Sequence, residues 1–237
     1  MYLSVGALLT CVSFTFAQYV MDTTVMQECL AKELGDVSIA KQLTDLLVED
    51  VFTWKMPAPI AISEIKTIIA YAFGNRILLN GNREPGPVNE ALADLIVRLY
   101  SETGAHVYAQ WEIAEAIGNR IAPEHIIAIY PTVDERANVV YLSTTGVAQA
   151  VIKQVHGDAK SLGKVAVIGF NDHVRRCVEE SRTAGMDAYM PEGYVMPSEY
   201  DQQSGQPWTR TRLIYLEHEI VGRITKRKAK LIEEANK

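Results

Sequence analysis

Short apolar runs alternate with longer amphipathic segments over the second two thirds of the chain. The runs are rich in β-branched residues and bounded by Gly, Pro or polar residues, which is typical of buried strands. Strands are predicted over residues 76–80, 105–110, 126–130, 165–168 and 187–190. Helices are predicted over residues 88–102, 112–118, 135–156, 172–184 and 209–235. This alternation predicts an α/β fold, a Rossmann-like parallel sheet of about five strands with helices on both faces.

The preceding part of the chain has a helical pattern instead. Leucine and valine recur at helical spacing over residues 23–52, with a break expected at Gly35-Asp36. A second helix is expected over residues 64–73, with Ser63 as its N-cap and Gly74 as its end. We therefore predict an N-terminal apolar and helical region over residues 1–74 and an α/β domain over residues 75–237.

The first 21 residues allow two interpretations. The segment from Leu3 to Met21 includes no charged residue. Its length is close to that of a membrane span or of the apolar part of an export signal. No Lys or Arg precedes the run, which argues against a signal peptide. The alternative is a segment packed against the rest of the protein or in a partner's groove. Residues 1–21 are thus a candidate contact with a membrane or a protein partner, and the localisation stays open between cytoplasmic and membrane-associated.

Composition excludes some classes of function. The formal net charge is −6, and no basic face typical of nucleic-acid binding is evident, so no nucleic-acid partner is expected. The basic run from Arg223 to Lys230 is interpreted as the solvated face of a helix. The three cysteines are widely spaced and predict neither a zinc site nor a disulfide framework.

Polar residues follow the ends of four predicted strands. In a parallel sheet these ends share one edge, where small-molecule ligands bind. The candidate ligand-binding residues are Asn80, Gly81, Asn82, Gln110, Glu135, Asn138, Asn171, Arg176 and Arg212. Guanidinium groups and helix N–H groups at this edge suit a small anionic or polar ligand. The competing interpretation is that these residues only form turns and caps.

Two further residues are candidates for proton transfer. His173 is proposed to act as a general acid or base, or to contact a phosphate group, because the pKa of histidine lies near neutrality. Glu112 is its proposed carboxylate partner. The position of His173 in the first turn of a helix predicts a partly exposed side chain. No catalytic triad, nucleophile elbow or metal-spaced cluster defines a reaction, so enzyme activity is left open. The alternative function is a non-catalytic structural or interaction subunit of a larger assembly.

The order of these motifs resembles the YdcF-like family over residues 76–223. The similar segments are Ile77 to Gly81, Gln110 to Ala116, Thr132 to Asn138, the His-x-x-Arg element of His173 and Arg176, and Trp208 to Arg212. The second segment shares its Glu and Ala residues with the family. The chain departs from the family at Gln110-Trp111, where Ser-Gly-Gly is frequent, and Glu135 and Asn138 are not adjacent.

The resemblance implies a ligand-binding α/β domain with an envelope-related role. It also implies S-adenosylmethionine as one candidate cofactor. The GxGxxG and GxxxxGK[ST] patterns of dinucleotide and nucleoside triphosphate sites follow none of the predicted strands.

Overall fold

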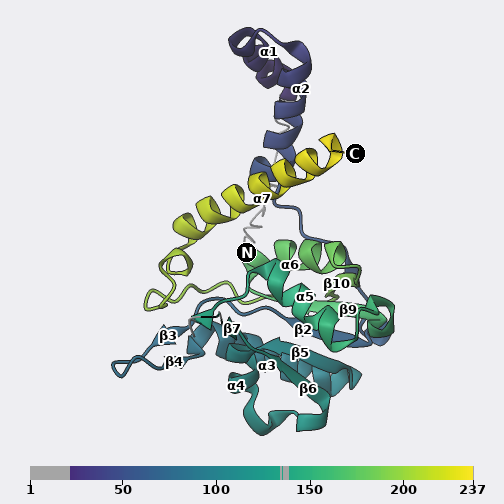
Figure 1. Ribbon diagram of the computed structural model, residues 1–237, viewed down its shortest axis with the longest axis vertical. Coiled ribbons are helices and arrows are strands. Elements are labelled where there is room, and N and C mark those ends of the chain that lie inside the picture. The colour runs from purple at the N-terminus through teal and green to yellow at the C-terminus, as the bar shows by residue number, and fades with distance from the viewer. Residues whose placement is uncertain (1–21, 134, 136–138, 237) are drawn as a thin grey trace, which may run out of the picture. The chain divides into compact units, whose positions relative to one another are not determined.

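A computed structural model of the chain describes residues 22–133, 135 and 139–236 (Figure 1). It divides into two compact units, Met1–Thr53 and Trp54–Lys237. The apolar segment from Leu3 to Met21 lies outside the described residues, so the two interpretations of it stay predictions. Among the helices that the structure describes, none combines the length and apolar character needed to cross a membrane.

The first unit is a pair of helices, as predicted. Helix α1 (Thr23–Leu34) is capped by Asp22, whose carboxylate accepts hydrogen bonds from the backbone N–H groups of Thr24 and Val25. Gly35, with φ of 68°, ends α1, and Asp36 caps α2 (Val37–Leu46). A π-helical segment (Leu47–Phe52) continues α2. The predicted break at Gly35-Asp36 is confirmed.

The second unit is built on a six-stranded sheet in which every pairing is parallel. Its strands are β1 (Pro59–Ile60), β2 (Thr67–Ala70), β5 (His106–Gln110), β6 (Ile126–Ile129), β9 (Lys164–Ile168) and β10 (Asp187–Pro191). The order across the sheet is β1-β10-β9-β2-β5-β6. Ile69 in the central strand β2 lies opposite Tyr108 of β5 and Val167 of β9. The predicted Rossmann-like fold is confirmed.

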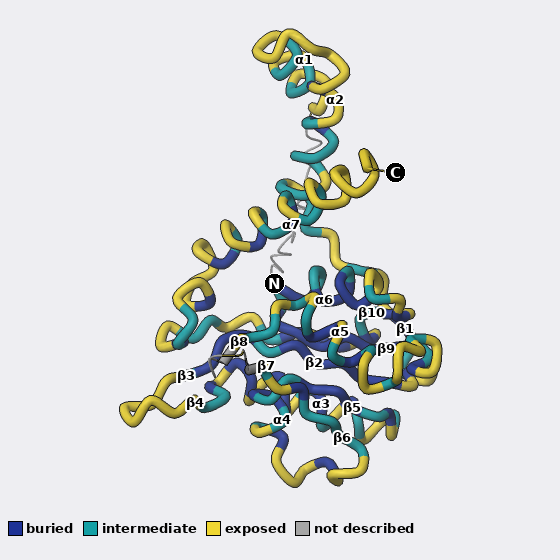
Figure 2. Tube along the Cα trace, in the orientation of Figure 1, coloured by how far each residue is buried: buried dark blue, intermediate teal, exposed yellow. Residues whose placement is uncertain are grey.

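Helices cover both faces of the sheet (Figure 1). Helices α3 (Gly86–Thr103) and α4 (Trp111–Ile117) pack together on one face, and α5 (Thr144–Gln154) and α6 (Asn171–Thr183) pack together on the other. The last helix is α7 (Arg212–Ala235). Single 3-10 turns lie at Ile62–Glu64, Gly118–Arg120, Pro123–His125, Ala159–Leu162 and Pro207–Thr209. All four residues of β2 are buried, so the core is centred on this strand (Figure 2).

The central strand lies where the sequence predicted a helix. Residues 64–73 were expected to be helical, yet Thr67–Ala70 form β2. The run from Ile68 to Phe73 is apolar throughout, so neither the helical nor the strand period stands out in it. Ser63 and Gly74 also resemble the N-cap and the terminating glycine of a helix. The sheet unit consequently begins at Trp54, earlier than the boundary predicted at residue 75.

Two other predicted elements are wrong. Residues 76–80 do not enter the main sheet; β3 (Arg76–Ile77) and β4 (Arg83–Glu84) form an antiparallel hairpin instead. The helix expected over residues 135–156 begins only at Thr144, where the Ser143 hydroxyl caps it by accepting from the N–H of Gly146. A short antiparallel pair, β7 (Thr132–Val133) and β8 (Val139–Val140), precedes it. The β-branched pair Val139-Val140 favours extended backbone over helix.

Candidate functional site

The carboxyl ends of β2 and β9 form the topological switch point of the sheet. From β2 the chain continues through α3 to β5 on one side, and it later returns to β9 on the other side. Loops that leave neighbouring strands in opposite directions open a crevice between them, where ligands of open α/β sheets bind. The loop after β2 and the start of α6 therefore frame the candidate site.

Side chains from neighbouring elements fix the loop after β2. The Gln110 side-chain oxygen accepts from the N–H of Ala72 at 2.8 Å, and the Asn89 side-chain oxygen accepts from the N–H of Phe73 at 2.9 Å. The Asn89 amide donates in turn to the carbonyl of Gly74 at 2.8 Å. Gln110, expected to bind a ligand, thus uses its carbonyl oxygen to position this loop.

Gly74→Ala tests how tightly this loop is packed. Gly74 has φ of 72°, and an added Cβ would lie 2.5 Å from the Ser204 hydroxyl and 2.8 Å from that of Thr209. Both hydroxyls are buried and hydrogen-bonded to each other. We expect the free energy of unfolding to fall by about 2 kcal/mol, since strain and crowding add. Urea denaturation measures it, with Gly157→Ala as the control: its φ is 87°, but nothing lies near the added Cβ.

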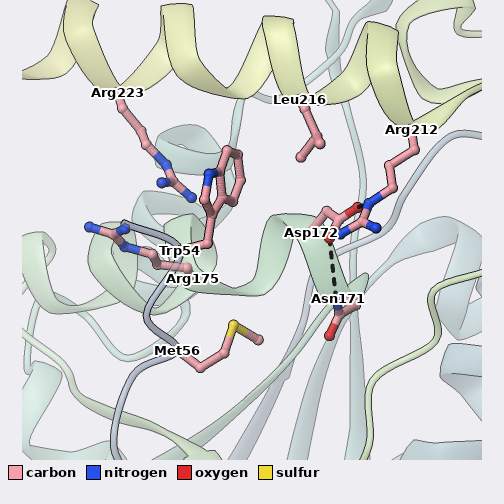
Figure 3. Close-up of a pocket in the computed structure, with 8 residues that line it drawn as sticks. All are labelled: Trp54, Met56, Asn171, Asp172, Arg175, Arg212, Leu216 and Arg223. Atoms are coloured by element: carbon pink, nitrogen blue, oxygen red, sulfur yellow. Dashed lines mark hydrogen bonds and ion pairs between the residues drawn. The ribbon is translucent and has the colours of Figure 1, made fainter. Parts of the chain in front are cut away.

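A pocket of about 260 Å³ lies at the start of α6 (Figure 3). Its lining residues come from the segment after residue 53, from α6 and from α7: Trp54, Met56, Asn171, Asp172, Arg175, Arg212, Leu216 and Arg223. The lining thus combines three guanidinium groups with one carboxylate, one indole and two apolar side chains. Asn171 and Arg212, both predicted ligand residues, meet in this pocket.

Asp172 organises the polar side of the pocket. Its carboxylate accepts from Arg212 Nε at 2.9 Å and Nη2 at 3.3 Å, from the Tyr200 hydroxyl at 2.8 Å and from the Asn171 amide at 3.2 Å. The N-cap of α6 is Phe170, so Asn171 is not the helix cap that the competing interpretation would make it. Burial and the bond to Asp172 raise the pKa of Tyr200, which keeps its hydroxyl protonated as a donor.

The Arg223 side chain forms the opposite wall of the pocket. Its guanidinium lies 4.0 Å from the centre of the Trp54 ring, in a cation–π contact. Arg175 Nε donates to Glu179 at 2.9 Å, and Arg223 Nε donates to Glu219 at 3.4 Å. The arginines are therefore held in place by carboxylates, two of which lie outside the pocket lining.

His173 and Arg176 belong to a buried network rather than to the pocket lining. Arg176 donates to Glu219 at 2.8 Å, to the Thr144 hydroxyl at 3.1 Å and to the Tyr215 hydroxyl at 3.2 Å. His173 is 7% exposed, and its Nδ1 lies 3.8 Å from a Glu219 oxygen. The expectation of a partly exposed His173 is wrong, because Phe73 and Tyr215 lie against its ring. This network joins α6 to α7.

The pKa values in this network follow from burial and charge. Burial lowers the pKa of His173, and the nearby Arg176 guanidinium lowers it further. Burial opposes ionisation of Glu219 as well, but His173, Arg176 and Arg223 outweigh it and bring the pKa of Glu219 to about 2. Glu219 is therefore ionised and His173 neutral at pH 7, so His173 is poorly placed to donate a proton.

Glu112 lies in a second polar cluster, at the carboxyl end of β5. Its side chain is 1% exposed, and its Oε2 has no hydrogen-bond partner among the described residues. Burial raises the pKa of Glu112 to about 7, against the weaker opposing effects of Asn75 and Arg83. Arg83 donates to the Asn75 side-chain oxygen at 2.9 Å, and its guanidinium lies 5.0 Å from the Tyr141 ring centre. A carboxyl group with this pKa can accept or release a proton near neutrality.

The remaining predicted residues lie elsewhere. Asn80, Gly81 and Asn82 form the exposed tip of the β3–β4 hairpin, where the Asn80 side chain accepts from the N–H of Asn82 at 2.9 Å. This placement follows from the hairpin that replaces the predicted strand. Glu135 is exposed in the segment between β7 and β8, and Asn138 lies outside the described residues.

Comparison with known proteins identifies no family for this chain. No protein-family model, curated protein or solved structure matches the chain. The YdcF-like resemblance therefore stays a prediction from sequence motifs. No group of three or more His, Cys, Asp or Glu side chains within residues 22–133, 135 and 139–236 is arranged to hold a metal ion.

Proposed function

We propose that this protein binds a small anionic, nucleotide-like ligand in the pocket at the start of α6. The observation that carries the proposal is the pocket lining, in which three arginines and an indole face a single carboxylate at the carboxyl edge of β9. Arginine suits carboxylate and phosphate groups because its planar fork offers two parallel donors. Trp54, with the Arg223 guanidinium over its ring, adds an aromatic wall against which a base can pack.

Arg212 is the residue best placed to meet the ligand. Its side chain is 68% exposed although Asp172 holds its guanidinium. An anionic group arriving from solvent can therefore bind its free N–H groups without breaking a buried ion pair. The volume of about 260 Å³ is just below the usual range for small-molecule sites, which fits one base or one anionic group rather than a whole dinucleotide.

The resemblance to the YdcF-like family makes S-adenosylmethionine a candidate ligand. Its carboxylate suits the arginines, its adenine suits the aromatic and apolar side chains of the lining, and its ammonium and sulfonium cations need the Asp172 carboxylate. Asp172 can accept a hydrogen bond from a ribose hydroxyl or from the amino group. The proposal is one of binding alone, since Asp172, the carboxylate of the lining, is held in an ion pair with Arg212 and Glu112 belongs to a separate cluster.

Arg212→Ala tests the proposal with two probes, S-adenosylmethionine and adenosine monophosphate. We expect at least one probe to raise the melting temperature of the wild type, and the variant to bind it about tenfold more weakly. Isothermal titration calorimetry measures the affinity. Arg212→Ala also removes a partner of the buried Asp172 carboxylate, so thermal unfolding without ligand separates a loss of stability from the loss of affinity.

Arg120→Ala is the matched control. Arg120 is also a partly exposed arginine with one carboxylate partner, Asp94, but it lies in the 3-10 turn after α4. Its loss should leave the affinity of either probe unchanged. Equal affinity in the wild type and Arg212→Ala, or no binding of either probe and no small molecule detected by mass spectrometry of the purified protein, would contradict the proposal.

A further inference from the structure

Helix α7 has its polar side against the protein and its apolar side outward. Tyr215, Glu219 and Arg223 are buried against the rest of the sheet unit. Lys226 continues this inner face, with its ammonium 2.9 Å from Glu180 of α6. The large apolar residues of the helix that face solvent are Leu213, Ile214, Val221, Leu231 and Ile232, which are 47–70% exposed. An ordinary surface helix has the reverse arrangement.

These five residues form a single stripe along the helix. At about 100° of rotation per residue, they all fall within an arc of roughly 100°. Two charged residues, Glu217 and Lys228, and the half-buried Ile224 fall in the same arc, and the half-buried Ile220 lies at its border. From Leu213 to Ile232 the stripe is roughly 30 Å long. An exposed stripe of apolar residues of this length is typical of an interface.

The stripe is complementary to itself when two helices run antiparallel. With the two-fold axis near residues 222 and 223, Leu213 faces Ile232 of the second copy, and Ile214 faces Leu231. In the same register Glu217 faces Lys228, and Val221 faces Ile224. Each charge in the stripe thus meets the opposite charge, while the apolar residues meet one another.

We propose that α7 binds α7 of a second copy of this chain, as an antiparallel two-fold dimer. A two-fold interface must be self-complementary, and the stripe satisfies this in both shape and charge. A parallel pair would place Glu217 beside Glu217 and Lys228 beside Lys228, which is repulsive. An anionic lipid surface would match Lys228 but would repel Glu217.

Sedimentation velocity of the full chain tests the dimer. We expect the wild type to dimerise and Lys228→Glu to weaken the dimer about tenfold, because each of the two symmetric ion pairs becomes a repulsion. The double variant Glu217→Lys/Lys228→Glu exchanges the charges and should restore the wild-type dissociation constant. Lys153→Glu, an exposed lysine on α5, makes the same change in net charge and should have no effect.

Three results would overturn the proposal. The first is a monomeric wild type at its highest soluble concentration. The second is a dimer that the exchanged charges fail to restore. The third is a monomer that sediments with vesicles of phosphatidylglycerol, which would identify a lipid surface as the occupant of the stripe. Circular dichroism of each variant separates loss of association from loss of folding.

Discussion

Glu219→Gln is expected to lower the free energy of unfolding by about 3–5 kcal/mol at pH 7, because it removes the carboxylate shared by two arginines in a buried network. The Glu219 carboxylate is fully buried and bonds to Arg176, Arg223 and the Tyr215 hydroxyl. Glutamine keeps the shape but offers one acceptor oxygen and no charge. Arg176 and Arg223 would then stay in the interior and lose the carboxylate that they share. Guanidinium chloride denaturation measures the loss.

The dependence on pH separates this effect from a simple loss of packing. The folded pKa of Glu219, about 2, lies below its ordinary value of 4.5. Its contribution to stability is therefore complete above pH 4.5 and is lost as the pH falls towards 2. We expect the difference between wild type and variant to shrink over this window. Glu233→Gln, an exposed glutamate on the same helix but outside the apolar stripe, is the control and should change stability by less than about 0.5 kcal/mol.

Glu112→Gln is expected to act in the opposite direction and to stabilise the protein by about 3 kcal/mol at pH 8. The folded pKa of Glu112, about 7, lies above its ordinary value of 4.5 because burial disfavours the carboxylate. Between pH 4.5 and 7 the folded chain holds a proton that the unfolded chain releases. The contribution of Glu112 to stability is therefore most favourable below pH 4.5 and falls as the pH rises to 7. Glutamine removes this dependence.

Thermal unfolding from pH 4 to pH 8 measures the change in slope. Glu115→Gln, an exposed glutamate on the same helix, should follow the wild type at every pH. A variant that is less stable than the wild type at pH 8 would show that ionised Glu112 has favourable partners in the fold. A gain in stability would mean that the carboxylate is retained at a cost, as is usual for functional groups.

The sequence was sufficient to predict four of the six strands of the main sheet. β5, β6, β9 and β10 are apolar runs between clear breaks, and their helices have an unambiguous apolar period. β2 could not be found in this way, because a strand buried on both faces has no alternation and its flanking Ser63 and Gly74 resemble helix ends. β1 has only two residues, and its pairing with β10 depends on tertiary contacts.

The candidate site was predicted only in part, for a different reason. Asn171 and Arg212 were found because they follow predicted strand or loop ends. Asp172 was not among the predicted ligand residues, because its role depends on Arg212 and Tyr200, which are distant in the sequence. Trp54 and Met56 lie more than a hundred residues before α6, and no local pattern connects them with it. The unusual pKa of Glu112 likewise arises from packing that the sequence does not specify locally.

The position of β2 has a consequence for how the chain folds as it is synthesised. Thr67 pairs with His106 on one side and with Val165 on the other, so its partners are translated roughly forty and a hundred residues later. Until β9 leaves the ribosome, one edge of this central strand has no neighbour. Ile68 and Ile69 are then open to chaperones and to aggregation. The nascent chain should be most vulnerable to proteases in this interval, and translation pauses before residue 164 would lengthen it.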